Sequence, residues 1–569
     1  MTRILTTLTI VLLLILSASL TAKPSSAAER LGQVAEQYVK KWFEFDPVYA
    51  TEMGDHSYDD HYPDFSQRSF GKFASALRDI RNGMNTISQG ELSVEQKVDY
   101  LTLQGSIETQ LLYLSRSPLM QDNPKLFSGK ATDGINQIML SQSLSDTVKL
   151  ESILGRLDDL PRFLKSAQKL LKEPPQIWIL LADEEIENMV GFLNDIVGYF
   201  GPKFPQRRDE LQEKLATAAS ALEDFSDFLD TLKTKEGQPF AVGKDFYDKL
   251  LRQQYFLDYD SDSLLKVGEA LFAKSAKLYD SVSAIVDTLP MPEDFAYFIP
   301  KSFCRNDVMD YFQWEINQTR DWIVSHDFAT VPASVGECVP VVTSAFIHNV
   351  VGGIAYQPVG PFEPTQIGRF YVQPSPDSLS DANRSAYFRY CTRRGFKGAV
   401  AYDVYPGHHL QMQMANHNPS LMRRIQRDNM MVEGWALYCE EEMYREKFYG
   451  DDLRTYLATL GGIRFDAARM VVDVKLQTGQ FTYQQAVDWM VANLDAEVDY
   501  IEKEVNRYTL TPAQPSSYLL GKEYLLMIRD LYKTKLGQKY TLRKFHDFIL
   551  GQGGISPVLV YKQVTGQIF

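Results

Sequence analysis

Apolar residues recur at intervals of three and four along most of this chain, which is the spacing of amphipathic helices. One clear apolar face comprises Phe70, Phe73, Leu77, Ile80, Met84 and Ile87. Ser93 and Gln96 fit a capping box at the start of the next helix. The same periodicity predicts helices over 150–171, 184–199 and 207–233, and again over 465–476, 486–498 and 518–536. The pattern therefore predicts a mainly α protein.

The region 331–375 differs from the rest because it is rich in Val, Phe, Tyr and Gly and shows few helical stripes. Short strands are predicted at 341–343, 346–347 and 370–372, from their β-branched and aromatic residues. Pro340 is tolerated at the start or the edge of a strand, but not inside a central strand. No Gly-, Ser- or Pro-rich linker divides the chain. We therefore expect residues 29–569 to form a single large multi-helix domain with a small β element.

Residues 1–28 have the features of a signal peptide: Arg3, an apolar run over 4–16, and the small residues of 26–28. This segment predicts a periplasmic or secreted protein that has no membrane association once the segment is cleaved. The alternative is an uncleaved anchor, although the apolar run is short for a membrane span of ~20 residues. No cysteine follows the run, so the sequence does not predict a lipid anchor.

The formal charge of −14 argues against nucleic acid and anionic membranes as partners. Export permits disulfides. The four cysteines, Cys304, Cys338, Cys391 and Cys439, allow three complete pairings, and Cys439 is equally compatible with a buried free thiol.

The stretch from 400 to 442 concentrates groups that bind metals or transfer protons. Adjacent His408 and His409 follow Pro406-Gly407, a pair suited to a helix start, and Glu433 lies near the expected start of the next helix. Neighbouring helical positions differ by ~100°, so the two imidazoles point in different directions. One interpretation is a zinc site; the other is a hydrogen-bonded histidine pair with Glu433 as a helix-start acid. The HExxH pattern of many zinc peptidases is absent.

The stretch resembles the bacterial domain of unknown function 885 family, whose core motif is H-E-x-x-P-G-H-H-x-Q followed by V-E-G-W-A-L-Y. Residues 51–60 are similar to the family's LGDHRYDD signature, and residues 504–522 and 545–547 also follow family order. The resemblance spans nearly the whole mature chain. It implies an exported, largely helical, zinc metallopeptidase-like protein with a zincin- or gluzincin-like cleft.

Carried onto this sequence, the resemblance implies that His408, His409 and Glu433 bind metal and that Asp403 is the catalytic base. The chain departs from the motif at Tyr402-Asp403, where the family has His-Glu, and at Gln477, where many members have histidine. A phenol is a poor zinc ligand because its proton has a pKa of ~10. Aspartate is one methylene shorter than glutamate, and a base must reach its proton.

The C-terminal part of the resemblance implies further roles. Tyr508 or Tyr518 would stabilise the oxyanion of a tetrahedral intermediate. Arg507 and Lys522 would hold a substrate carboxylate, and the alternative for both cations is a solvated helix charge. His56 and Asp59, in the N-terminal signature, are read as turn-building residues or as part of the site.

Two functions follow from these residues. The first is an exported metal-dependent hydrolase of peptides or small peptide-like substrates, with altered or lost activity. The second is a non-catalytic peptide- or protein-binding scaffold in the cell envelope. Whether the chain is an enzyme, and its oligomeric state, stay open at this point.

Overall fold

Amphipathic helices make up most of the molecule, as the apolar periodicity predicts. The computed structural model describes residues 26–568 except 117, 236, 238, 291–300, 303, 344–353, 374–378 and 391–395. The predicted signal peptide lies almost entirely outside the described residues. Its last three residues begin the fold, because Ser26 caps the first helix and Ala27 is buried.

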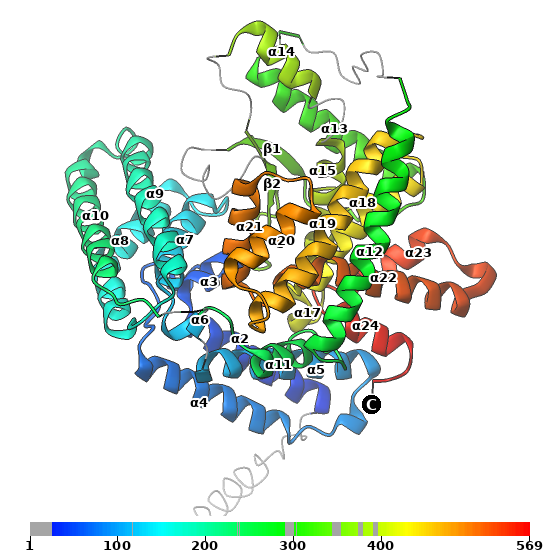
Figure 1. Cartoon of the computed structure of the whole chain (residues 1–569). Helices are drawn as coiled ribbons and strands as arrows, with labels where there is room; N and C mark the ends of the chain where they lie inside the picture. Colours follow the sequence, from blue (N-terminus) through cyan, green and yellow to red (C-terminus); the bar gives the residue numbers. More distant parts are fainter. Residues whose placement is uncertain are drawn as a thin grey trace, which may run out of the picture.

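The N-terminal half is entirely helical in its regular structure (Figure 1). Its helices are α2 (Ala27–Phe45), α3 (Pro47–Met53), α4 (Gln67–Met84), α5 (Val94–Arg116), α6 (Pro118–Gln121), α7 (Pro124–Leu140), α8 (Asp146–Leu170), α9 (Gln176–Phe200) and α10 (Arg208–Asp230). The predicted face of α4 is buried along its whole length, and Ser93 and Gln96 exchange the two capping-box hydrogen bonds. Periodicity and capping thus predicted α4, α5, α8, α9 and α10, whereas α3, α6 and α7 were not predicted.

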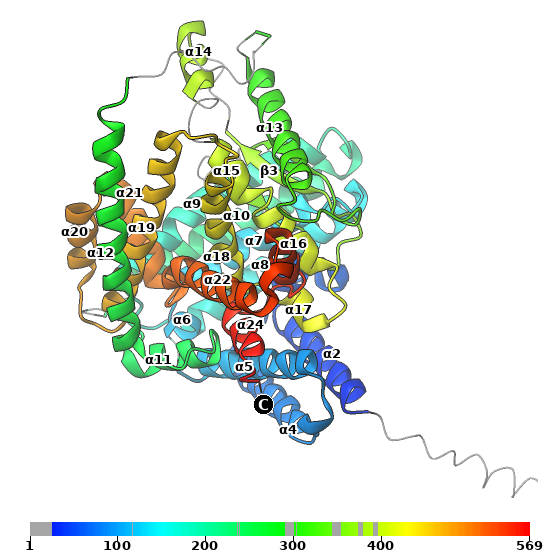
Figure 2. The ribbon, with the colours of Figure 1, turned by 90° about the vertical axis from the view of Figure 1, so that its right-hand side faces the viewer.

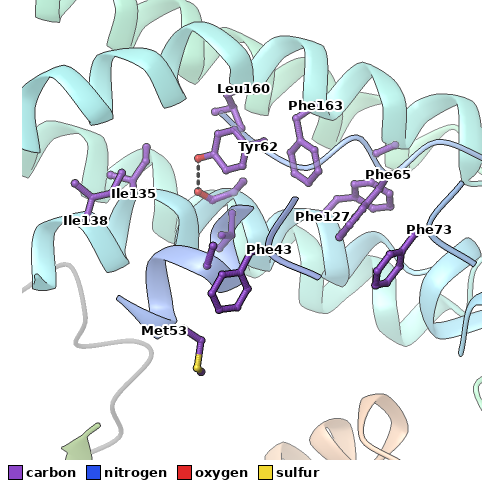
Figure 3. Packing of buried hydrophobic residues seen from close by; sticks show 14 of the residues in the cluster. Phe43, Met53, Tyr62, Phe65, Phe73, Phe127, Ile135, Ile138, Leu160 and Phe163 are labelled. Carbon is purple, nitrogen blue, oxygen red and sulfur yellow. Dashed lines mark hydrogen bonds between the residues drawn. The ribbon is translucent and has the colours of Figure 1, made fainter. Parts of the chain in front are cut away.

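An aromatic core holds this half together (Figure 3). The ring of Tyr62 stacks on that of Phe163, and its hydroxyl donates to the carbonyl of Ala131 at 2.7 Å. Phe65 packs edge-on against Phe127. Aromatic rings bury more apolar surface than other side chains, so they contribute most to the stability of this core.

The small β element is a three-stranded sheet of β1 (Cys338–Val342), β2 (Ile354–Gln357) and β3 (Gly368–Val372). Strand β3 is central, parallel to β1 and antiparallel to β2. Pro340 therefore lies on an edge strand, as expected from its missing N–H. The strand predicted at 346–347 lies outside the described residues, and β2 was not predicted.

The remaining helices are α11 (Lys244–Gln253), α12 (Ser261–Val286), α13 (Arg305–Ser325), α14 (Asp381–Tyr390), α15 (Phe396–Asp403), α16 (His408–Asn416), α17 (Leu421–Ile425), α18 (Asn429–Arg445), α19 (Leu453–Gln477), α20 (Tyr483–Asn493), α21 (Val498–Leu510), α22 (Gln514–Leu536), α23 (Leu542–Leu550) and α24 (Pro557–Val564). Of these, α13 and α15 contact the sheet, whereas α11 and α24 lie at the opposite end of the molecule (Figures 1 and 2). The face predicted over 486–498 belongs to two helices, because α20 ends at Asn493 and α21 begins at Val498. Helix α22 stops before Gly537, as predicted.

The structure also describes three of the four cysteines. Cys304, Cys338 and Cys439 are free thiols, and Cys439 is fully buried, whereas Cys391 lies outside the described residues. In the part of the chain that the structure describes, no helix combines the length and the apolar character needed to cross a membrane.

Candidate functional site

A tight reversal between α15 and α16 brings Tyr402, Asp403 and His408 to one place. Helix α15 ends at Asp403 and α16 begins at His408, so Pro406 lies in the connection and not, as expected, in the first turn of the helix. Gly407 is required at this reversal, since a Cβ there would lie 1.6 Å from the carbonyl oxygen of Tyr402. The connection thus folds the two ends of the motif back onto each other.

Glu433 reaches this reversal from α18. Its Oε2 lies 3.5 Å from Nε2 of His408 and accepts a 2.7 Å hydrogen bond from the hydroxyl of Tyr402. The Tyr402 and His408 rings meet edge to face, with centroids 4.8 Å apart. An imidazole and the downstream carboxylate therefore do meet across two packed helices.

Glu433 is not a helix-start acid, so this part of the alternative interpretation is wrong. Helix α18 begins at Asn429, and its N-cap is Asp428, whose carboxylate accepts from the backbone N–H groups of Met430 and Met431. Glu433 lies beyond the first turn, where the helix dipole has little effect on a charge.

His409 points away from Glu433, toward the sheet. Its Nε2 lies 2.8 Å from the carbonyl oxygen of Gly336, and its Nδ1 lies 3.1 Å from the hydroxyl of Tyr356. Both ring nitrogens are therefore engaged by other groups. The structure brings His408, and not the predicted pair of histidines, to the carboxylate.

Burial sets the protonation of the groups at this centre. It raises the pKa of Asp403 to about 8, with the negative charge of Glu433 adding to the shift. Burial also lowers the pKa of His408, against the opposing effect of Glu433, and raises that of Tyr402 well above its usual value. These shifts favour the uncharged forms of all three groups.

These residues do not fit an ordinary three-ligand zinc site. Two groups that suit zinc, His408 and Glu433, converge, but the third position holds the phenol of Tyr402, which is hydrogen-bonded to the carboxylate. Nowhere among the described residues do three or more His, Cys, Asp or Glu side chains gather in a way that could hold a metal ion. A catalytic zinc requires three protein ligands.

The tyrosines of the C-terminal motif lie in a buried charge network beside this centre. Tyr508 donates to Oε2 of Glu504 at 2.8 Å, and Arg469 donates to its hydroxyl at 3.2 Å. The Arg469 guanidinium lies 4.7 Å from the ring centroid of Tyr518. Burial raises the pKa of Tyr518 to about 12, and the charge of Glu433 contributes to this rise. Tyr518 therefore lies within electrostatic range of Glu433, and its role in catalysis stays a prediction.

The two predicted substrate cations already have protein partners. Arg507 is bonded to Glu504 at 2.9 Å and to Gln514. Lys522 forms an ion pair with Glu441, and only 3% of the lysine is exposed. The alternative that Lys522 is a solvated helix charge is wrong, because it bridges α22 and α18 inside the protein.

Gln477, where the resemblance led us to expect histidine, connects two parts of the backbone. Its amide nitrogen donates to the carbonyl of Tyr508 at 2.7 Å, and its amide oxygen accepts from the N–H of Val242 at 3.2 Å. Both ends of this amide are satisfied by backbone groups.

His56, in the N-terminal signature, joins two distant parts of the chain. Its Nδ1 lies 2.7 Å from Asp59 and its Nε2 lies 3.1 Å from Glu363. Burial would lower the pKa of His56, but hydrogen bonds to the two carboxylates raise it to about 9. Sequence reasoning missed Glu363, 307 positions away, and Arg469, for which the sequence carries no local signal. It placed Glu504 in the C-terminal family motif without assigning it a role.

A long groove of about 1150 Å³ runs along α2, separate from the Glu433 centre. Its walls are apolar residues of α2, the loop that carries His56, and residues 419–424. Nε of Arg424, which also lines the groove, is buried and has no hydrogen-bond partner.

Known proteins resemble this chain mainly in fold. A "putative lipoprotein of unknown function" from Shewanella oneidensis matches with a TM-score of 0.73 and 18% identity, over 94% of this chain and 99% of that one. A "putative lipoprotein" from Colwellia psychrerythraea matches with a TM-score of 0.76 and 18% identity, over 95% of this chain and 99% of that one. No curated protein matches this sequence significantly.

The family comparison is more specific. A model described as a bacterial protein of unknown function, DUF885, matches residues 47–564, which include the reversal at 402–408, Glu433 and the N- and C-terminal signatures. This chain therefore belongs to the DUF885 family.

Proposed function

We propose that this chain is a non-catalytic member of its family that binds peptides in the cell envelope. The observation that carries the proposal is the 2.7 Å hydrogen bond from Tyr402 to Glu433. It places a protonated phenol where the family motif has a histidine, so the carboxylate is held by a hydrogen bond within the protein.

The groove along α2 supports the choice of a peptide ligand. Its volume of about 1150 Å³ exceeds the ~300–1,000 Å³ of most small-molecule pockets. Leu31, Ala35 and Phe43 provide an apolar wall for side chains. The Arg424 side chain, which lines the groove, provides a positive charge for a peptide carboxylate.

The location in the cell envelope rests on the leader-like residues 1–28. The two structural neighbours are themselves described as lipoproteins, and the likeness to them supports the same compartment. This chain has no cysteine after its apolar run, so we propose a periplasmic or secreted protein.

A metal-dependent peptide hydrolase with an altered ligand set, in a zincin-like cleft, is the second candidate. It is favoured by the distance of 3.5 Å between His408 and Glu433, because these residues would supply two of the three protein ligands of a catalytic zinc.

Metal analysis separates the two candidates. We expect dialysed protein to retain well under one zinc per chain, and added zinc to leave its melting temperature unchanged. The double variant Tyr402→His/Asp403→Glu restores the motif and should bind zinc and melt at a higher temperature in its presence. Stoichiometric zinc in the wild-type protein, accompanied by peptide cleavage, would establish the hydrolase instead.

Peptide binding is tested with a fluorescent pool of random nonapeptides, measured by anisotropy. We expect saturable binding by the wild type and weaker binding by Leu31→Ser and Arg424→Gln. Arg543→Gln, on an exposed arginine outside the groove, is the matched control. The absence of saturable binding, or equal binding by all variants, would reject the groove as the peptide site.

A further inference from the structure

A second cavity, of about 300 Å³, lies between α2, α5 and the start of α18. It shares no lining residue with the groove along α2, and Glu433 does not line it. Its walls include Tyr38, Trp42, Gln110 and Tyr113, together with one carboxylate, Asp428, and one cation, Arg427.

Three polar atoms of this wall are buried without a hydrogen-bond partner. They are the hydroxyl of Tyr38, the hydroxyl of Thr109 and the amide oxygen of Gln110. Tyr38 is fully buried, and its hydroxyl lies near Ser106 without a hydrogen bond of ordinary geometry. A buried polar group without a partner is destabilising. Three residues of the cavity wall therefore have spare hydrogen-bonding capacity.

Asp428 adds a carboxylate to the same cavity. One of its oxygens, Oδ1, caps α18 by accepting from the N–H groups of Met430 and Met431. Arg427 also lines the cavity, and its positive charge is paired with Glu52 at 2.8 Å. Among the described side chains, no cation forms an ion pair with Asp428. Burial raises the pKa of this carboxyl to about 7, which a bound cation would reverse.

Aromatic rings complete the lining. Tyr38, Trp42, Tyr113 and Phe256 all border the cavity. The faces of such rings attract cations, most strongly where water is excluded. An ammonium group offers three donors and no acceptor, which suits a carboxylate, an amide oxygen and hydroxyl oxygens.

We propose that this cavity is a binding site for a small organic amine, whose ammonium group is held by Asp428 and Gln110 among the aromatic rings. The site does not depend on peptide binding in the groove along α2. Its size, at the lower end for ligand sites, restricts the ligand to a small molecule.

The test uses the full chain and defined probes: butylamine, 1,4-diaminobutane and lysine, with butanol as a neutral analogue. We expect at least one amine to bind saturably with a stoichiometry of one by calorimetry and to raise the melting temperature. Butanol should do neither. Equal effects of butanol and the amines, or no saturable binding of any amine, would show that the cavity holds only water and would overturn the proposal.

Two variants test whether Asp428 and Tyr38 bind the amine. Asp428→Asn removes the charge, but asparagine caps helices as well as aspartate does, so the fold should persist. We expect it to weaken amine binding by about tenfold or more, as for the loss of a charge-assisted hydrogen bond. Asp452→Asn is the matched control, because Asp452 caps α19 and does not line the cavity.

Tyr38→Phe removes a hydroxyl that has no partner in the protein. A purely structural role therefore predicts no loss of stability in the ligand-free protein. We expect amine binding to weaken several-fold while the melting temperature of the free protein is kept. Unchanged amine affinity in both Asp428→Asn and Tyr38→Phe would place the amine elsewhere and reject this site.

Discussion

Gly434 of α18 and Gly521 of α22 lie backbone to backbone where these helices cross. A Cβ on Gly434 would lie 2.6 Å from the carbonyl carbon of Gly521. Each glycine is next in sequence to a charged residue of the candidate site, Glu433 and Lys522. The close crossing therefore sets the position of Glu433 relative to α22 and buries Lys522 against α18.

Gly521→Ala tests this crossing. The new Cβ would lie 2.0 Å from the carbonyl oxygen of Met430, so the helices must move apart. We expect a loss of about 1–3 kcal/mol in the free energy of unfolding, measured in urea, as for other overpacked cores. The control is Gly462→Ala in α19, where a Cβ meets no atom within 4 Å. That variant should be neutral or more stable, because alanine favours helix.

Tyr402→Phe removes the hydrogen bond to Glu433 and keeps the ring. The variant leaves a partly buried carboxylate without its phenol donor, so we expect a loss of about 1–3 kcal/mol in urea unfolding. Tyr449→Phe is the matched control, since the Tyr449 hydroxyl is buried without a hydrogen-bond partner. If both variants unfold at the same urea concentration, the Tyr402–Glu433 bond does not stabilise the centre.

Lys522→Met tests whether this lysine serves the fold. The substitution leaves Glu441 buried with a single remaining partner, Arg445. Breaking a buried ion pair by removing one partner costs about 3–5 kcal/mol. Adding Glu441→Gln should recover part of that loss, and the double-mutant cycle measures the coupling. Full stability of Lys522→Met would instead leave the lysine free for a ligand.

The raised pKa of His56 predicts that this residue stabilises the fold in a pH-dependent way. Its pKa is raised from an ordinary value of ~6.5 to about 9 by the carboxylates of Asp59 and Glu363, which outweigh the opposing effect of burial. A group whose pKa is higher in the folded than in the unfolded protein stabilises the folded state. This contribution is complete at a pH below the unfolded pKa, and it is lost as the pH rises through the folded pKa. We expect the stability difference between wild type and His56→Gln to be largest below pH ~6.5 and to vanish above pH ~9.

Urea midpoints across that pH range give the measurement. His61→Gln, on the exposed histidine of the same loop, controls for the substitution itself. A wild-type advantage over His56→Gln that is constant with pH would show that the ion pairs do not contribute.

The helices and their approximate limits were predictable because their signals are local. The buried stripe of α4 and the capping box at Ser93 follow from residues a few positions apart. The edge position of Pro340 follows from its own missing N–H. The order of the family motifs was also visible in the sequence, and it led to the correct family.

The tertiary structure alone decided which groups of the motif meet. Two adjacent histidines look equivalent in sequence, but the helix turns them ~100° apart, and the packing of α16 then directs His409 toward Gly336 and His408 toward Glu433. The partners of His56 and Lys522 depend on contacts with Glu363 and Glu441 that no local pattern encodes. Periodicity specifies a helix and its buried face, whereas the meeting of side chains depends on how whole helices cross.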